Sequence, residues 1–387
     1  MSRVHKIFIT TFVISFFTFG NAGAAGNIRI GQMEIHPYLS LKEVFSDNIY
    51  STSTLEKSDS ITVTTPGVKL HWPFGMHKFE AEYYVVDSRY DRYRGENTTN
   101  HHAKGLLGLQ FGSYFSLTGS GAFDKGQEPR SSSASGFIEV YRTNTASVTA
   151  AYQLATRSKV QLDYSKTTWN FMTSNFRDRD EGIMAGYLYY RFLPKTSAFI
   201  EYERKAVDFV EATTPLDNSM GSLLFGLAWE MTGRSKGTVK FGRTSKDFEN
   251  SEVKDFSVWS WSVDLNHKFS ERTSLTVVGQ RQVNETNAYG TAYYITTGAY
   301  GELSHGFMSK MALLLRGSYG TDRFSNAVFP ETLTREDKTR MLGTGLRYTM
   351  KDWLEFGVDY NRKNRDSNIN VNDYHETQYV ISANMMF

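Results

Sequence analysis

Residues that could perform acid–base or nucleophilic chemistry are few and scattered in this sequence. The 387-residue chain has no cysteine, which excludes thiolate nucleophiles, zinc–sulfur sites and disulfides. Its nine histidines include His101, His102 and His375, but no spacing typical of a nucleophile beside a base appears. The stretch "GRTSKD" (242–247) lacks the phosphate-binding loop pattern. We therefore expect no enzyme, no cofactor and no metal site.

Two charge clusters, "DRDE" (178–181) and "REDK" (335–338), are further candidates for binding chemistry. Their carboxylates could bind calcium or bridge to lipopolysaccharide. Solvated loop edges have the same composition, and the sequence favours that interpretation. Without Arg3 and Lys6, which lie in the leader described below, the 43 basic residues fall to 41 and equal the 41 acidic ones. A neutral chain lacks the basic surface that nucleic-acid binding requires.

The elements that would position these groups are β-strands. Apolar and polar residues alternate in "VQLDYS" (160–165), "SVWSWSVDLN" (257–266) and "LEFGVDYN" (354–361). A period of two over such lengths predicts strands. We expect 18 antiparallel strands between residues 33 and 387, joined alternately by short turns and longer polar loops. Short turns at one end and long loops at the other are typical of outer-membrane barrels, with both termini periplasmic.

The N-terminus predicts export from the cytoplasm. A basic segment, "MSRVHK", precedes the apolar run "IFITTFVISFFTFG" and the small-residue site "NAGA". This pattern indicates a signal peptide over residues 1–24, and a membrane anchor is the alternative. Residues 25–32 would be a short periplasmic N-terminal segment, and residues 33–387 the barrel. The predicted location is the bacterial outer membrane.

The C-terminus continues the alternation to the last residue. Phe387, Met385, Ala383, Ile381 and Tyr379 share one face of a strand. In hydrocarbon, unpaired backbone groups cost several kcal/mol each, so the first and last strands must pair. A soluble β-sandwich or propeller is the alternative fold. The terminal Phe387 also resembles the signal that the barrel-assembly machinery recognises.

Aromatic residues cluster near the predicted strand ends, as expected for two membrane–water interfaces. Residues beside the short turns are Trp72, Phe74, Tyr114, Tyr152, Phe192, Trp229, Phe269, Phe307, Trp353 and Phe387. Residues near the long loops are Tyr90, Phe123, Trp169, Phe209, Phe248, Tyr289, Phe324 and Tyr374. We expect these two groups to form two outward-facing rings.

The polar faces of the strands predict the lining of the lumen. Charges of both signs are expected to face inward at Arg191, Glu201, Glu203, Lys240, Asp264, Arg316, Arg347, Glu355 and Asp359. They could line a polar conduit or pair with one another and brace the wall. Inward tyrosines are expected at Tyr84, Tyr187, Tyr189 and Tyr293, where they could stack on a sugar or pack the wall.

One N-terminal segment resembles a known family. The stretches "FSDNIY", "KSDSITVTTPGVKL" and "PFGMHKFEAEY" are similar to the start of the putative β-barrel porin 2 family, through Asp47, Asn48, Ser58, Asp59, Pro66 and Gly67, with Phe74 and Gly75. The resemblance implies an 18-stranded outer-membrane barrel associated with exopolysaccharide or capsule secretion. It also implies a partner reached from the periplasm, a polysaccharide export protein without its own barrel.

The sequence therefore favours a translocation pore for secreted exopolysaccharide or capsule. A general or solute-selective diffusion porin is the alternative, and a structural or adhesive barrel is a third possibility. Expected partners are outer-membrane lipid and lipopolysaccharide, the barrel-assembly machinery and the polysaccharide export protein, but no nucleic acid.

Overall fold

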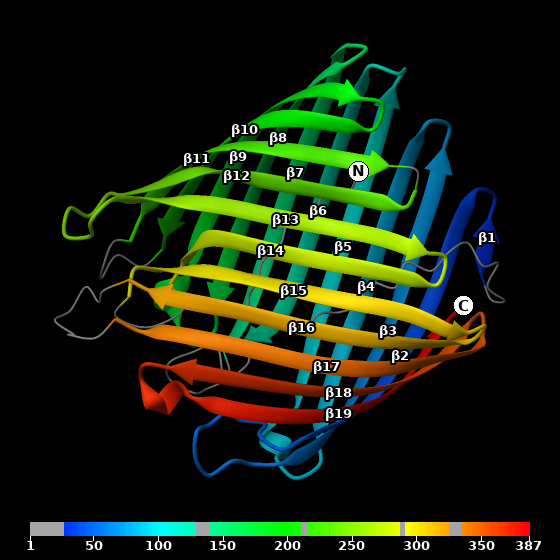
Figure 1. Ribbon diagram of the computed structural model, residues 1–387, viewed down its shortest axis with the longest axis vertical. Helices are drawn as coiled ribbons and strands as arrows, with labels where there is room; N and C mark the ends of the chain where they lie inside the picture. The colour runs from blue at the N-terminus through cyan, green and yellow to red at the C-terminus, as the bar shows by residue number, and fades with distance from the viewer. Residues whose placement is uncertain (1–26, 129–138, 211–215, 232, 287–290, 326–333) are drawn as a thin grey trace.

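The structure is a computed structural model that describes residues 27–128, 139–210, 216–231, 233–286, 291–325 and 334–387 (Figure 1). The predicted signal peptide, residues 1–24, lies outside these ranges. One antiparallel sheet of 19 strands contains nearly all of the described chain.

The long strands follow one another in sequence order, each paired with the next. They are β2 (Met33–Ser46), β3 (Asp59–Phe74), β4 (His77–Tyr90), β5 (Thr98–Phe111), β6 (Phe115–Glu128), β7 (Glu139–Ala155), β8 (Ser158–Phe171), β9 (Arg179–Leu193), β10 (Thr196–Phe209), β11 (Asn218–Met231), β12 (Ser235–Phe248), β13 (Phe256–Ser270), β14 (Thr273–Glu285), β15 (Tyr293–Met308), β16 (Met311–Phe324), β17 (Glu336–Lys351), β18 (Leu354–Ser367) and β19 (Tyr374–Met386).

The last strand, β19, pairs with β2, which closes the sheet into a barrel. The register of β19 on β2 runs from Gln378 opposite Ser46 to Met386 opposite Tyr38. The Phe387 N–H then donates to the Pro37 carbonyl at 2.9 Å. This confirms the predicted closed barrel of 18 strands, because the nineteenth strand, β1, lies outside the ring.

The short strand β1 (Ile28–Ile30) folds back on the start of β2. Gly31 makes the reversal with a φ of +63°, a conformation that glycine adopts without strain. The predicted N-terminal segment 25–32 therefore contributes strand pairing beside the seam where the barrel closes.

The hairpins at one end of the barrel, here called the short-turn rim, have short turns, as predicted. At the β3–β4 hairpin the strands continue to Phe74 and resume at His77. The turn at Gly75 has a φ of +64°, as two-residue hairpin turns require. Strand pairing extends this far because every added ladder bond satisfies two backbone groups.

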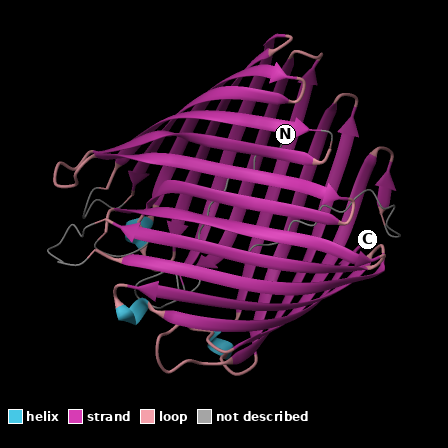
Figure 2. Ribbon diagram, in the orientation of Figure 1, coloured by secondary structure: helices cyan, strands magenta, loops and turns pink. Residues whose placement is uncertain are grey.

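The opposite end, here called the long-loop rim, carries the longer connections. The described residues include three short 3-10 helices there (Figure 2): η1 (Arg94–Glu96), η3 (Asn175–Arg177) and η4 (Asn370–Asn372). In the ranges that the structure describes, no helix is long and apolar enough to cross a membrane.

Alternation along each strand separates an outer apolar face from an inner polar one. On β10, Ile200 and Tyr202 are 44% and 57% exposed, whereas Glu201 between them is 1% exposed. Exposed apolar side chains cover the outer face of the other strands in the same way. This surface needs a nonpolar solvent such as lipid.

One pair of neighbouring strands separates before reaching the long-loop rim. The pairing of β13 with β14 stops at Trp261 opposite Arg281. In contrast, β14 stays paired with β15 up to Glu285 opposite Tyr293. The β14–β15 hairpin consequently diverges from β13 near this rim (Figure 1).

Candidate functional site

A row of inner side chains crosses one wall of the barrel and forms the first part of the candidate site. Successive cross-strand partners place Tyr38, Tyr84, His102, Asp124 and Trp169 along it, with Gly67 and Thr143 between. The row starts in the middle of β2 and ends two residues from the long-loop end of β8. It approaches that rim because barrel strands tilt relative to the axis. We call this set the inner row.

Aromatic faces and charged groups alternate in the lower part of the inner row. The Tyr38 hydroxyl donates to Glu82 Oε1 at 3.0 Å, and Lys104 Nζ lies 2.6 Å from Glu82 Oε2. The rings of Tyr84 and His102 stack with centroids 4.5 Å apart. His102 Nδ1 lies 2.7 Å from Asp124 Oδ1. Such a surface offers flat apolar faces beside hydrogen-bonding groups, which suits a sugar.

Gly67 explains how the inner row begins. A Cβ at this position would lie 2.3 Å from Cζ of Tyr38, so the tyrosine ring lies directly over the glycine. Lys69 Nζ lies 5.2 Å from the centroid of the same ring. The family-like motif residue Gly67 thus allows a tyrosine to lie flat against the inner wall.

The other motif residues stabilise the seam and the loops, and they form no reactive site. Asp47 Oδ1 accepts the Thr377 N–H at 2.7 Å, which ties the first long loop to β19. The buried Asn48 amide donates to the His375 carbonyl at 2.8 Å. Asp59 accepts N–H groups of the β4–β5 connection. Ser58 is exposed, and Pro66 pairs with Leu39 in the ladder.

Several predicted lumen residues form ion pairs along the inner wall. Lys240 Nζ lies 2.8 Å from Glu201 Oε2, and the Tyr187 hydroxyl donates to Glu201 Oε1 at 2.7 Å. Asp359 Oδ1 accepts from Arg316 at 2.8 Å and from Arg347 at 2.7 Å. These contacts agree with wall bracing at these five positions.

The remaining predicted lumen residues have different surroundings. Arg191 donates to the Thr156 carbonyl at the short-turn rim. Asp264 is exposed, Glu203 is half-buried, and both make polar interactions. Glu355 is half-buried near Arg347. The structure does not bring these four residues together into one site.

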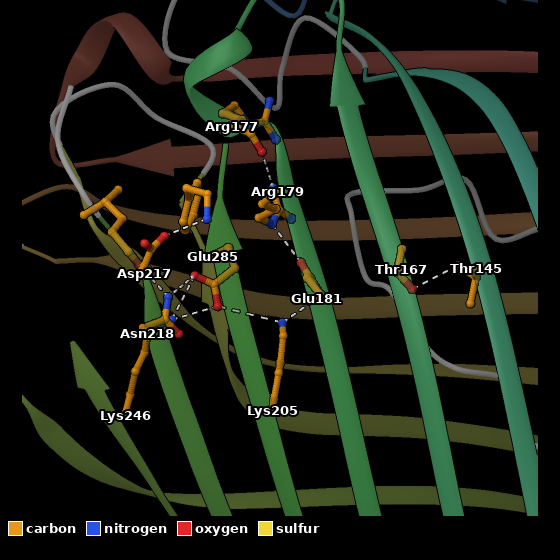
Figure 3. A network of polar contacts seen from close by, with 12 residues as sticks. Thr145, Thr167, Arg177, Arg179, Glu181, Lys205, Asp217, Asn218, Lys246 and Glu285 are labelled. Carbon is orange, nitrogen blue, oxygen red and sulfur yellow. Dashed lines mark hydrogen bonds and ion pairs between the residues drawn. The ribbon is translucent and has the colours of Figure 1, made fainter. Parts of the chain in front are cut away.

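A second inner region, at the long-loop rim, contains buried charges (Figure 3). Arg177 makes two parallel hydrogen bonds to Glu128, at 2.8 and 2.9 Å. Arg179 donates to the Arg177 carbonyl at 3.0 Å and begins a chain of alternating charge over four strands. The chain runs from Arg179 to Glu181 at 2.8 Å, Glu181 to Lys205 at 2.9 Å, Lys205 to Glu285 at 3.8 Å, and Glu285 to Lys246 at 2.7 Å. We call these residues the mouth network.

The mouth network corrects the interpretation of "DRDE" and "REDK" as solvated loop edges. Arg179 and Glu181 point inward and are shielded, whereas Asp180 points outward to Lys166. Arg335 and Asp337 pair inside at 2.7 Å, with side chains 8% and 2% exposed. Strand alternation within each cluster, with every second charge inward, is the signal that could have revealed this.

The predicted aromatic ring near the long loops is also wrong in most of its members. Trp169, Phe248, Phe324 and Tyr374 are buried inside the mouth. Phe209 packs against the apolar cluster of Leu216, Phe248 and Ala292. The predicted member Phe123 is exposed, as are the aromatics Tyr164, Tyr202, Trp259, Tyr319 and Tyr379, which were not predicted for this ring. Tyr289 lies outside the described residues.

Aromatic and cationic groups interlock at the top of the inner row. The Trp169 and Phe171 rings stack 5.9 Å apart, and the Arg179 guanidinium lies 5.0 Å from the Trp169 centroid. Arg177 lies 4.0 Å from the Phe171 centroid. The inner row therefore runs from a hydrated lower part into a packed mouth.

Of the predicted inward tyrosines, Tyr84 belongs to the inner row, and Tyr187 and Tyr189 pack against Phe199. Tyr293 stacks on Phe256 with centroids 4.1 Å apart at the mouth. Across the described ranges, no group of three or more His, Asp or Glu side chains could hold a metal ion.

Solved structures similar to this chain share little sequence identity with it. No curated protein matches the sequence. The fold is similar to the outer membrane protein OpdK of Pseudomonas aeruginosa (10% identity, TM-score 0.48, 91% of this chain and 99% of the other). It is similar to OpdL of the same organism (8% identity, TM-score 0.49, 92% and 100%). It is also similar to the siderophore receptor PirA of Pseudomonas aeruginosa (9% identity, TM-score 0.46, 91% and 80%).

The family comparison covers almost the whole chain. The family described as "Putative beta-barrel porin 2" matches residues 21–387. The match includes every strand of the barrel and the segment from which the resemblance was first inferred. Together with the closed barrel and its apolar outer face, it indicates a bacterial outer-membrane protein of the porin type. The chain therefore belongs to the putative beta-barrel porin 2 family.

Proposed function

We propose that this barrel is the outer-membrane translocation pore for a secreted exopolysaccharide or capsular polysaccharide. The observation that carries the proposal is the inner row, in which the Tyr38 ring lies flat over Gly67 and the Tyr84–His102 stack lies beside Glu82 and Asp124. Sugars have apolar ring faces surrounded by hydroxyls, and this combination matches both.

The arrangement of the row suits movement as well as binding. Its members lie on neighbouring strands, so a chain of sugars can exchange one contact for the next without leaving the wall. Conduction requires sites that bind weakly and repeatedly. The hydrated side chains of Lys69 and Lys104, 43% and 52% exposed, leave water to solvate the moving polymer.

The balance of charge along the row is consistent with a polymer substrate. Lys69 and Lys104 flank the carboxylate of Glu82, and Asp124 is paired with His102. A strongly one-signed lining would favour small ions of the opposite sign. The mixed lining instead favours contacts through rings and hydroxyls.

The first test measures saccharide binding in the pore. Purified protein in planar bilayers is exposed to maltohexaose, to an oligouronate and to polyethylene glycol of equal size. We expect the saccharides to interrupt the ion current for longer than the polymer control. The double variant Tyr84→Ala, His102→Ala should shorten those interruptions by on the order of tenfold, since each stacking contact contributes about 0.5–1.5 kcal/mol. Tyr164→Ala, on the outer face, is the matched control.

The second test separates export from general diffusion in cells. A strain lacking the protein should lose surface polysaccharide while retaining uptake of small solutes. The double variant Tyr84→Ala, His102→Ala should restore less polysaccharide than the wild-type protein at equal barrel abundance. A strain that keeps full surface polysaccharide but loses small-solute uptake would instead support the diffusion porin.

A further inference from the structure

The outer end of the β14–β15 hairpin leaves the barrel wall and enters the mouth. Beyond the pair of Trp261 and Arg281, residues 256–260 of β13 do not pair with residues 282–285 of β14. β13 nevertheless remains paired with β12 as far as Phe256. We call residues 282–286 and 291–296 the outer arm.

Side-chain direction shows that the arm has moved inside the wall. Alternation on β14 puts Arg281, Val283 and Glu285 on the outer face, and Arg281 does point outward, donating to the Trp259 carbonyl at 3.1 Å. Glu285, four residues later, instead contacts Lys246 at 2.7 Å and Lys205 at 3.8 Å inside the barrel. The nominally outer face of the arm therefore packs on the inner face of β10–β13.

The aromatic contacts of the arm give the same result. Tyr293, the ladder partner of Glu285, stacks on the ring of Phe256 at 4.1 Å. On the opposite face of the arm, Tyr294 stacks on Phe324 at 5.2 Å. The arm is thus packed against β13 on one face and against β16 on the other.

Small residues lie where the arm bends. Gln280 pairs with Gly298, and Gly298 pairs with Gly320, which gives two adjacent glycines on β15 and β16 at the level of the divergence. A Cβ at Gly298 would lie 3.1 Å from the Gly320 Cα, so side chains there would be crowded. Glycines inside strands often mark tight bends or close approach.

We propose that the outer arm is a gate, closed in this structure and able to swing outward about the level of Gln280 and Arg281. When it swings out, residues 282–285 can pair with residues 256–260 and complete the β13–β14 ladder. The Tyr293 ring then leaves Phe256 and the mouth. The closed state is held by Glu285 with its two lysines and by the Tyr293 stack. The open state gains backbone hydrogen bonds, so two discrete states compete.

The outward-facing Arg281 stabilises the closed position as well. Its guanidinium satisfies the Trp259 carbonyl, a backbone group that the ladder would otherwise occupy. Arg281 also donates to Thr297 Oγ1 at 2.8 Å, on the neighbouring β15. The contact with the Trp259 carbonyl is available only while β13 and β14 stand apart, because a restored ladder places the β14 backbone there.

Single-channel recording of purified protein in planar bilayers tests the gate directly with salt as the only permeant species. We expect Glu285→Gln to raise the open probability by on the order of tenfold, because it removes a charge-assisted contact to two buried lysines. Glu302→Gln is the matched control, since it removes an inner ion pair to Arg316 on the same hairpin below the arm. Equal open probabilities for both variants and the wild type would overturn the proposal.

Crosslinking supplies a second, independent measurement. The chain has no cysteine, so the double variant Lys246→Cys, Glu285→Cys offers only two thiols. A short bifunctional thiol reagent with a cleavable disulfide should hold the arm closed and lower the mean conductance. Reduction should then restore the conductance in the same membrane. A current that is unchanged by crosslinking would show that the arm does not gate the pore.

The experiments test the gate and the proposed export function independently of each other. Loss of the gating effect in salt would leave saccharide binding on the inner row unaffected. Conversely, a pore that ignores saccharides could still open and close through the outer arm.

Discussion

The hydrated wall of β3–β6 and the mouth at the long-loop rim use the same residue types with opposite results. Lys104 on the wall has a side chain 52% exposed, although it pairs with Glu82. Lys246 in the mouth also pairs with a glutamate, and its side chain is 0% exposed. The difference lies in what covers each pair. Glu285 reaches Lys246 from the outer arm, which packs over the inner wall, whereas Glu82 and Lys104 lie side by side on neighbouring strands.

The largest expected effect comes from breaking the mouth network. Glu128→Ala leaves the buried Arg177 guanidinium without its two carboxylate hydrogen bonds. An unpaired buried charge costs about 3–5 kcal/mol, and the free energy of unfolding should fall by that amount. Urea unfolding in lipid vesicles, followed by tryptophan fluorescence, measures it. A loss below about 1 kcal/mol would mean that the mouth is as hydrated as the wall.

A labelling experiment compares the access of water to the two regions. Lys104→Cys on the wall and Val207→Cys in the mouth, where Val207 is 0% exposed, each introduce the chain's single thiol. A water-soluble maleimide should react with the wall thiol faster by on the order of a hundredfold, because the mouth must open locally first. Similar rates would show that the mouth is open to water most of the time.

Gly67→Ala tests a closely packed point of the wall. The added methyl would overlap the Tyr38 ring, and such overpacking costs about 1–3 kcal/mol. Equilibrium unfolding should show this loss, accompanied by weaker saccharide binding if the ring is displaced. Gly105→Ala on the same wall is the control, since its Cβ would meet no atom within 4 Å and should change stability little.

The smallest effect is expected for Lys104→Ala. Glu82 keeps Lys69 and the Tyr38 hydroxyl after this change. A solvent-screened pair of this kind contributes about 0–1 kcal/mol, so unfolding should be almost unaffected. A destabilisation as large as that of Glu128→Ala would remove the contrast between wall and mouth.

Sequence reasoning succeeded where the information is local. Alternation predicted 18 strands between residues 33 and 387, and the barrel strands run from Met33 of β2 to Met386 of β19. It also predicted that the last strand pairs with the first and that Glu201 faces inward. It gave the wrong environment for Trp169, Phe248 and Phe324, because their distance from the strand ends was read without the parity of each strand.

The sequence by itself determined a strand period of two, an apolar outer face and an end that must be paired, because backbone hydrogen bonding in lipid allows few solutions. Only the tertiary structure decided which inward charges are hydrated and which are buried. That choice depends on the tilt of the strands, the separation of β13 from β14 and the inward bend of the outer arm. These features bring Glu285 of β14 to Lys246 of β12, with the whole of β13 between them in the sequence. No local sequence pattern predicts such a contact.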